Sequence, residues 1–107
     1  MILRLWRGWT EPADAAAYER LLTGEIAPAI LERGIPGLRE LTVLRRLAGE
    51  VDGGEVLTAM TFDDLAAVAE FTGGDPRASV VPPSARALLA RFDQHSRHYA
   101  RIATFGP

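Results

Sequence analysis

The chain has 107 residues, of which 48% are hydrophobic and 24% charged, a composition that excludes a disordered chain and fits one folded domain. A formal net charge of −2, with the arginines scattered among acids, argues against a nucleic-acid-binding surface. The sequence has no cysteine and no lysine, which excludes disulfides, thiolate nucleophiles and Schiff-base chemistry.

The expected organisation is a single domain spanning residues 1–107. No apolar run reaches membrane-spanning length, and Met1 leads into a strand pattern without a basic segment or cleavage site. We therefore expect a cytoplasmic protein. A domain this small gains stability by burying surface in a partner, so we also expect an oligomer.

Residues 1–9 predict a strand with bulky apolar side chains on both faces. Trp6 belongs to one parity, whereas Leu5 and Trp9 belong to the other. A strand that is apolar on both faces is covered on both. We expect helices on one side and a second subunit on the other.

A long helix is predicted over residues 13–33, with Tyr18 on its inward stripe as a core residue with a polar tip. Pro28 lies inside this helix and removes a hydrogen bond to the carbonyl of Gly24. We therefore expect a kink or break between Gly24 and Pro28, and an end of the helix at Gly34.

A hairpin follows, with alternating strands over 38–48 and 55–62 and the turn signal Asp52-Gly53 between them. The sequence then predicts a second helix, ended by a pair of glycines.

Asp63 or Asp64 provides the N-cap of this second helix. Its apolar residues Leu65, Val68 and Phe71 recur at helical spacing and are predicted to face inward.

The last third predicts a short helix over 84–92 and a terminal strand over 95–102. The element order indicates an α+β, ferredoxin-like split βαβ sandwich, with a four-stranded antiparallel sheet and helices on one face. By parity the other face carries Trp6, Leu57 and Ala59, and a homodimer formed through the sheet would cover them.

Three stretches carry a resemblance to a known family: ILRLWRG at 2–8, TFDDLAAVAEF at 61–71, and residues 80–99. Together they resemble the antibiotic biosynthesis monooxygenase-like family of the dimeric α/β barrel superfamily, over nearly the whole chain. The resemblance implies a dimer whose two sheets close into a barrel, with a pocket between sheet and helices in each subunit.

Active members of that family oxidise electron-rich aromatic polyketides with oxygen and no cofactor, relatives degrade haem, and many members have no established activity. The active types use an asparagine on the first strand and a tryptophan at the end of the third. The matching positions here are Arg7 and Phe62, and the chain contains no asparagine.

A predicted pocket lining follows from this resemblance and from strand parity. It consists of Arg7, Trp9, Met60, Phe62 and His98. Trp9, Met60 and Phe62 are its predicted ligand contacts, although packing at the end of the sheet is the favoured interpretation of Trp9.

The candidate catalytic residues are His98 and Arg7. His98 could accept a proton from a phenolic substrate, but a hydrogen-bonded structural histidine is the favoured interpretation. Arg7 could stabilise an oxyanion or, equally, pair with a glutamate of the first helix. His95 and His98 lie on opposite faces of their strand, so no metal site is expected, and no cofactor is expected either.

Two functions from different classes result. The leading hypothesis is a homodimer that binds a small planar hydrophobic or aromatic metabolite, with cofactor-independent oxygenation as a candidate reaction. The alternative is a non-catalytic ligand-binding or dimeric assembly module, which the missing asparagine and third-strand tryptophan favour. Haem degradation ranks lowest, for want of a well-placed axial histidine.

Overall fold

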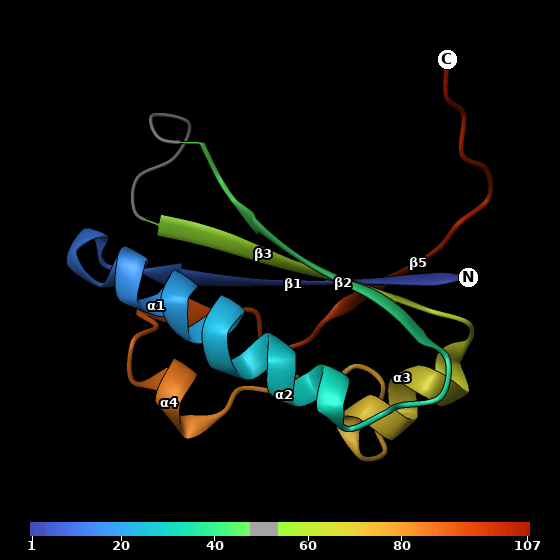
Figure 1. The fold of residues 1–107 in the computed structure, drawn as a ribbon, viewed down its shortest axis with the longest axis horizontal. Helices are drawn as coiled ribbons and strands as arrows, with labels where there is room; N and C mark the ends of the chain where they lie inside the picture. Colours follow the sequence, from blue (N-terminus) through green and yellow to red (C-terminus); the bar gives the residue numbers. More distant parts are fainter. Residues whose placement is uncertain (48–53) are drawn as a thin grey trace.

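An antiparallel sheet organises the computed structural model, which describes residues 1–47 and 54–107 (Figure 1). The central strand β1 pairs along one edge with β3, which pairs in turn with β2. The other edge of β1 pairs with two short strands, β4 and β5, which together fill the fourth strand position. The strands are β1 (Ile2–Thr10), β2 (Leu38–Arg45), β3 (Gly54–Phe62), β4 (Arg91–Phe92) and β5 (Arg97–Ala100).

All the helices lie on one side of this sheet (Figure 1). This arrangement confirms the predicted α+β ferredoxin-like fold, although the sheet does not close on itself. Within the described ranges, no helix combines the length and apolar character needed to cross a membrane. The helical elements are η1 (Pro12–Asp14), α1 (Ala15–Leu21), the π-helical turn η2 (Leu22–Ile26), α2 (Ala27–Glu32), α3 (Leu65–Thr72) and α4 (Pro83–Arg86).

The predicted irregularity of the first helix is present, but as a π-helical turn that joins α1 to α2. Because Pro28 has no N–H, the carbonyl of Gly24 lacks the usual α-helical donor. The N–H of Ala27 donates instead to the carbonyl of Leu22, which widens this turn without ending the helix.

The strand register decides which residues of β1 face the helices. Ile2 pairs with Phe62 and Arg4 with Met60, so the even-numbered residues of β1 share the helix-covered face with the buried residues of β3. This corrects the predicted face of Trp6, which lies toward the helices. Because both parities of β1 carry bulky side chains, its alternation could not select the face.

The core consists of two neighbouring apolar clusters beneath the helices. One gathers around Phe62 and Val68, both completely buried, and the other around Tyr18, which is 1% exposed. Tyr18 is therefore a core residue, as predicted. Both clusters lie between the sheet and the helical layer.

The C-terminal third differs from prediction in one element. The helix predicted over 84–92 ends at Arg86, and residues 91–92 form β4 instead. The N–H of Ala90 donates to the carbonyl of Trp9 at 2.7 Å, and the N–H of Asp93 to that of Arg7 at 2.9 Å. Pairing with the free edge of β1 overrides the helical spacing here.

Asp64 is the N-cap of α3, because its Oδ1 accepts a hydrogen bond from the N–H of Ala67 at 2.9 Å. Asp63 instead forms an ion pair with Arg39. Leu65 was predicted to face inward but is 51% exposed, since the first residue of α3 lies beyond the edge of the core. The hairpin strands are confirmed, while the predicted turn at Asp52-Gly53 lies outside the described residues.

Candidate functional site

A small cavity of about 50 Å³ lies between the sheet and the helical layer. At roughly 10–15 Å³ for each water, it has room for a few waters or one small polar group. A pocket that encloses a whole organic ligand usually measures about 300 Å³ or more. The lining residues are Arg4, Trp6, Tyr18, Leu22, Ile26, Ile30, Thr58, Met60, Phe71, Val80, Val81, Pro82 and Ala85.

A groove of about 350 Å³ adjoins the cavity, between α2 and the segment that precedes α4. Four apolar residues line both spaces: Ile26, Ile30, Val80 and Pro82. The groove therefore provides the volume that the inner cavity lacks. The π-helical turn contributes Ile26 to the shared wall, and π-bulges often occur at functional sites.

Among the residues that the structure describes, Arg4 is the only charged one that lines the cavity, and it is 3% exposed. Its Nη1 donates to the carbonyl of Pro76 at 2.6 Å, and its Nη2 to the carbonyl of Ala78 at 2.8 Å. A third contact joins Nη1 to Nε2 of His98 at 3.1 Å. The Phe71 ring lies 5.3 Å from the guanidinium carbon and adds a cation–π contact.

The contacts that this buried guanidinium makes with described residues are all to neutral groups. Among the described residues, no carboxylate lies within ion-pair distance of Arg4. Burial lowers the pKa of Arg4 from 12.5 to about 10. A difference of that size disfavours the charged form by about 3 kcal/mol, yet the group stays protonated at neutral pH. The cavity thus contains a positive charge without a negative partner from the described chain.

Tyr18 and Thr58 belong to the same lining, and each side chain carries a hydroxyl group. Neither hydroxyl has a hydrogen-bond partner within residues 1–47 and 54–107. Burial raises the pKa of Tyr18 to about 12, so its phenol stays protonated at neutral pH and can donate a hydrogen bond. The cavity therefore combines an unpaired cation with neutral donors in an apolar wall.

His98 lies beside Arg4 on the helix-covered face, where the β1–β5 register pairs the two residues. Because a guanidinium can only donate, Nε2 of His98 is the acceptor in their contact, and the ring proton belongs on Nδ1. Burial first, and then the charge of Arg4, lower the pKa of His98. His98 does not line the cavity; it orients Arg4.

This arrangement predicts a stability change with pH. Because the folded protein holds the pKa of His98 below its ordinary value of 6.5, the unfolded chain binds that proton at higher pH than the folded chain does. The free energy of unfolding should therefore fall as the pH drops through 6.5 toward the lower folded-state value.

Thermal unfolding of the wild type and His98→Gln, measured across this range, tests the effect. His98→Gln should show a smaller loss of stability, since the amide oxygen accepts from Arg4 without titrating. His95→Gln, at an exposed position, is the matched control. Equal pH slopes for the wild type and His98→Gln would contradict the prediction.

Two of the predicted site residues, Arg7 and Trp9, lie on the opposite face of the sheet from Phe62. The register therefore corrects the face on which they were predicted. Arg7 forms an ion pair with Asp93, with both oxygens of that carboxylate accepting at 3.0 Å. Its partner is thus an aspartate beside β4, and not a glutamate of the first helix. The guanidinium carbon of Arg91 lies 4.0 Å from the ring centroid of Trp9.

The other predicted residues lie on the helix-covered face. Met60 lines the cavity, whereas Phe62 is completely buried in the core and takes no part in the lining. Sequence reasoning missed Arg4 and Tyr18 as polar groups of the cavity. The available signal was an arginine between Leu3 and Leu5 in an apolar strand, which needs a special environment if it faces inward.

The described part of the chain contains no cluster of three or more histidine, aspartate or glutamate side chains able to hold a metal ion.

Solved structures share this fold, whereas no protein-family model and no curated protein matches the chain. A proposed antibiotic biosynthesis monooxygenase from Deinococcus radiodurans is 17% identical, with a TM-score of 0.68 over 100% of this chain and 98% of that one. Another from Bacillus cereus is 14% identical, with a TM-score of 0.67 over 99% of this chain and 97% of that one.

A third similar structure is a monooxygenase from Streptomyces coelicolor in complex with the ligand nanaomycin D. It is 18% identical, with a TM-score of 0.64 over 99% of this chain and 91% of that one. The neighbours thus have the fold of antibiotic biosynthesis monooxygenase-like proteins, as the sequence resemblance predicted. At these identities the likeness shows the fold and leaves activity to be argued from the site.

Proposed function

We propose that this chain forms a homodimer in which each subunit binds a small planar apolar metabolite between the sheet and the helices. The observation that carries the proposal is the apolar cavity together with the adjoining groove beside α2, which shares four lining residues with it. A ligand would place one end in the cavity and its larger body in the groove. The nanaomycin D complex of the Streptomyces coelicolor monooxygenase supports ligand binding by this fold.

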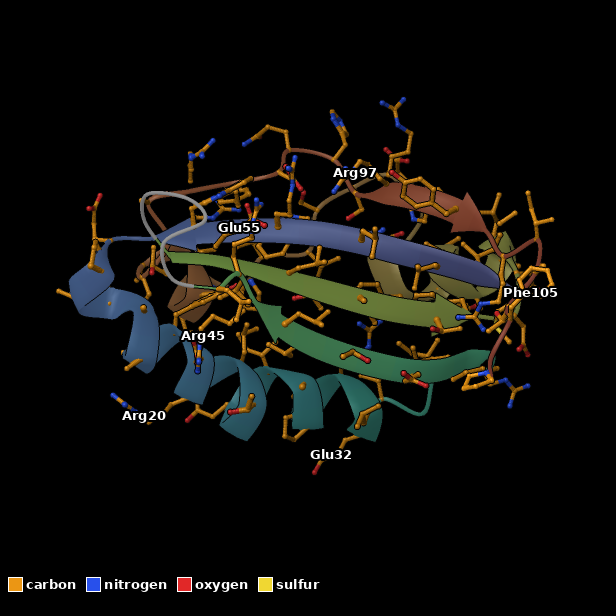
Figure 2. All side chains as sticks on the ribbon, turned by 90° about the horizontal axis from the view of Figure 1, so that it is seen from above. Arg20, Glu32, Arg45, Glu55, Arg97 and Phe105 are labelled. Atoms are coloured by element: carbon orange, nitrogen blue, oxygen red, sulfur yellow. The ribbon has the colours of Figure 1, made fainter. Side chains whose placement is uncertain are left out.

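The uncovered face of the sheet supports the dimer. Figure 2 views the sheet from this side, and no helix of the described residues crosses in front of β1 or β3. Leu5, Leu57 and Ala59 belong to this face by register. Leu44 and Tyr99 remain 44% and 48% exposed there, on two further strands. These apolar side chains, beside Arg7 and Arg97 on the same face, mark a candidate interface with a second copy of the chain.

A non-catalytic assembly module is the second candidate function. The small size of the inner cavity favours it, because about 50 Å³ does not enclose an organic molecule. In that case dimerisation through the sheet would be the whole function, and the groove would remain empty in solution.

Cofactor-independent oxygenation, with His98 as proton acceptor and Arg7 as oxyanion partner, remains a prediction. The contact between Nε2 of His98 and Arg4 occupies the lone pair that a base would use, which weakens the support for this role. The cytoplasmic location inferred from the sequence likewise remains a prediction.

Ligand binding can be tested by extracting the purified protein and identifying retained compounds by mass spectrometry. We expect a planar apolar compound with the wild type and its loss with Ala29→Trp, because Ala29 lines the groove and the indole would fill it. Ala16→Trp, on the exposed surface of α1, is the matched control and should retain the compound.

Absence of any retained or exchangeable planar compound from the wild type would favour the assembly module. If a compound is found, oxygen uptake with it as substrate, compared between the wild type and folded His98→Ala, tests turnover. Unchanged uptake in His98→Ala would remove the proposed base.

A further inference from the structure

We propose that the inner cavity is an oxyanion-recognition site, in which Arg4 and Tyr18 bind the ionised oxygen of an acidic aromatic ligand whose ring lies in the groove. The inference rests on the proposed function, because it requires a ligand there, and it adds the chemical class: an aromatic carboxylate or phenolate. Both ligand classes present the same group, an anionic oxygen at the edge of a planar aromatic ring system.

The first argument is the unused hydrogen-bonding capacity of Arg4. Its three polar contacts are to two backbone carbonyls and an imidazole. A guanidinium has more N–H groups than these contacts use, so the Nε–H and one Nη2–H have no acceptor within the described part of the chain. Because no described carboxylate neutralises the charge, an incoming anion would supply both the missing acceptor and the missing charge.

Tyr18 supplies an independent argument from another element. The residue is 1% exposed and lines the cavity, and its hydroxyl has no hydrogen-bond partner among the described residues. A hydroxyl that no protein group engages can donate a hydrogen bond to a ligand in the cavity. Thr58 of β3 adds a further hydroxyl without a described partner. Donors from strand and helix thus line one apolar space.

Size and charge agree with this assignment. A cavity of about 50 Å³ suits a carboxylate or a phenolic oxygen, whereas the groove of about 350 Å³ suits a ring system. The groove carries one residue of each sign, Glu25 and Arg33. Its outer part therefore has no strong preference for charge, and the selectivity for anions should arise at Arg4.

The test compares ligands that differ only in charge. We would measure binding to the intact protein by calorimetry for 2-naphthoate and for its neutral isostere 2-naphthamide. The wild type should prefer 2-naphthoate by roughly tenfold to a hundredfold, the range expected for a hydrogen bond to a charged group. A parallel pair, 4-nitrophenolate at mildly alkaline pH and neutral 4-nitroanisole, examines phenolates. If the protein prefers the anion only in the naphthalene pair, the ligand class is an aromatic carboxylate. If it prefers the anion only in the nitrophenyl pair, the ligand class is a phenolate.

Variants connect the preference to the named residues. Arg4→Gln should abolish the preference for 2-naphthoate while 2-naphthamide still binds. Tyr18→Phe, which removes only the unpartnered hydroxyl, should reduce it by a smaller factor. Arg20→Gln is the matched control, because Arg20 is an exposed arginine of α1 that lines neither the cavity nor the groove (Figure 2). It should leave the preference unchanged.

The inference does not depend on Arg4→Gln remaining folded. In the ¹⁵N-labelled wild type, the Nε–H signal of Arg4 should shift with 2-naphthoate and not with 2-naphthamide. Equal affinity for the charged and neutral ligands, or a preference that survives in Arg4→Gln, would overturn the oxyanion site and leave the proposed function standing. Failure of every probe to bind the wild type would overturn both.

Discussion

Ala59→Arg should convert the proposed dimer into a folded monomer. Ala59 lies on the open face of β3, with Leu5 of β1 on one side and Thr42 of β2 on the other. A second sheet packed against this face would bury the new guanidinium without a partner. An uncompensated charge at an interface costs several kcal/mol, and about 3 kcal/mol corresponds to roughly a hundredfold weaker association.

Sedimentation velocity over a concentration series is the direct measurement, with circular dichroism to confirm that the variant retains its helices and strands. Ala16→Arg is the matched control, since it adds the same charge to an exposed position of α1 on the other side of the molecule. A wild type that sediments as a monomer at tens of micromolar, or an Ala59→Arg that stays dimeric, would exclude the proposed interface.

Local signals in the sequence were sufficient for most of the fold. Helical spacing identified the helices that contain Tyr18 and Phe71, and period-two alternation identified β2 and β3. The N-cap at Asp64 and the end of α3 at Gly73, where φ is 87°, follow from side-chain and backbone preferences that act within a few residues. Interactions of that range are visible in a single sequence.

The candidate site was harder to predict because it depends on long-range pairing. If the pairing of β1 with β3 shifted by one residue, the two faces of β1 would be exchanged. The helix-covered face would then carry the set that includes Arg7 and Trp9 in place of the set that includes Arg4 and Trp6. Large apolar or aromatic side chains occupy both sets, so only the pairing with β3 decides between them. Position 4 was therefore missed, although the sequence reasoning correctly placed His98 on the face toward the helices.

The same limitation explains the helix predicted over 84–92. Its apolar spacing is real, and Ala85 and Leu89 do pack against the core. The edge of β1 nevertheless provides backbone partners for residues 90–93, and the ion pair of Arg7 with Asp93 holds the segment there. Neither partner is close in sequence, so no local pattern indicates this strand.

Phe62→Ala should lower the free energy of unfolding by about 3–5 kcal/mol, the usual cost of removing a buried aromatic ring. Phe62 is completely buried, its ring centroid lies 6.0 Å from that of Phe71, and it belongs to the cluster that includes Val68. The residue was first predicted as a ligand contact. Its position beneath α3, outside the cavity lining, instead predicts an effect on stability with little effect on binding.

Urea unfolding measures the effect on stability, and calorimetry with 2-naphthoate measures the effect on ligand affinity. Phe62→Leu keeps most of the apolar volume, so it should cost about 1 kcal/mol and leave the affinity unchanged. Met60→Ala provides the contrast, because Met60 is buried and also lines the cavity, so it should change both stability and affinity. A Phe62→Leu variant of normal stability that no longer binds would place Phe62 against the ligand, and the boundary between core and cavity would then have to move toward α3.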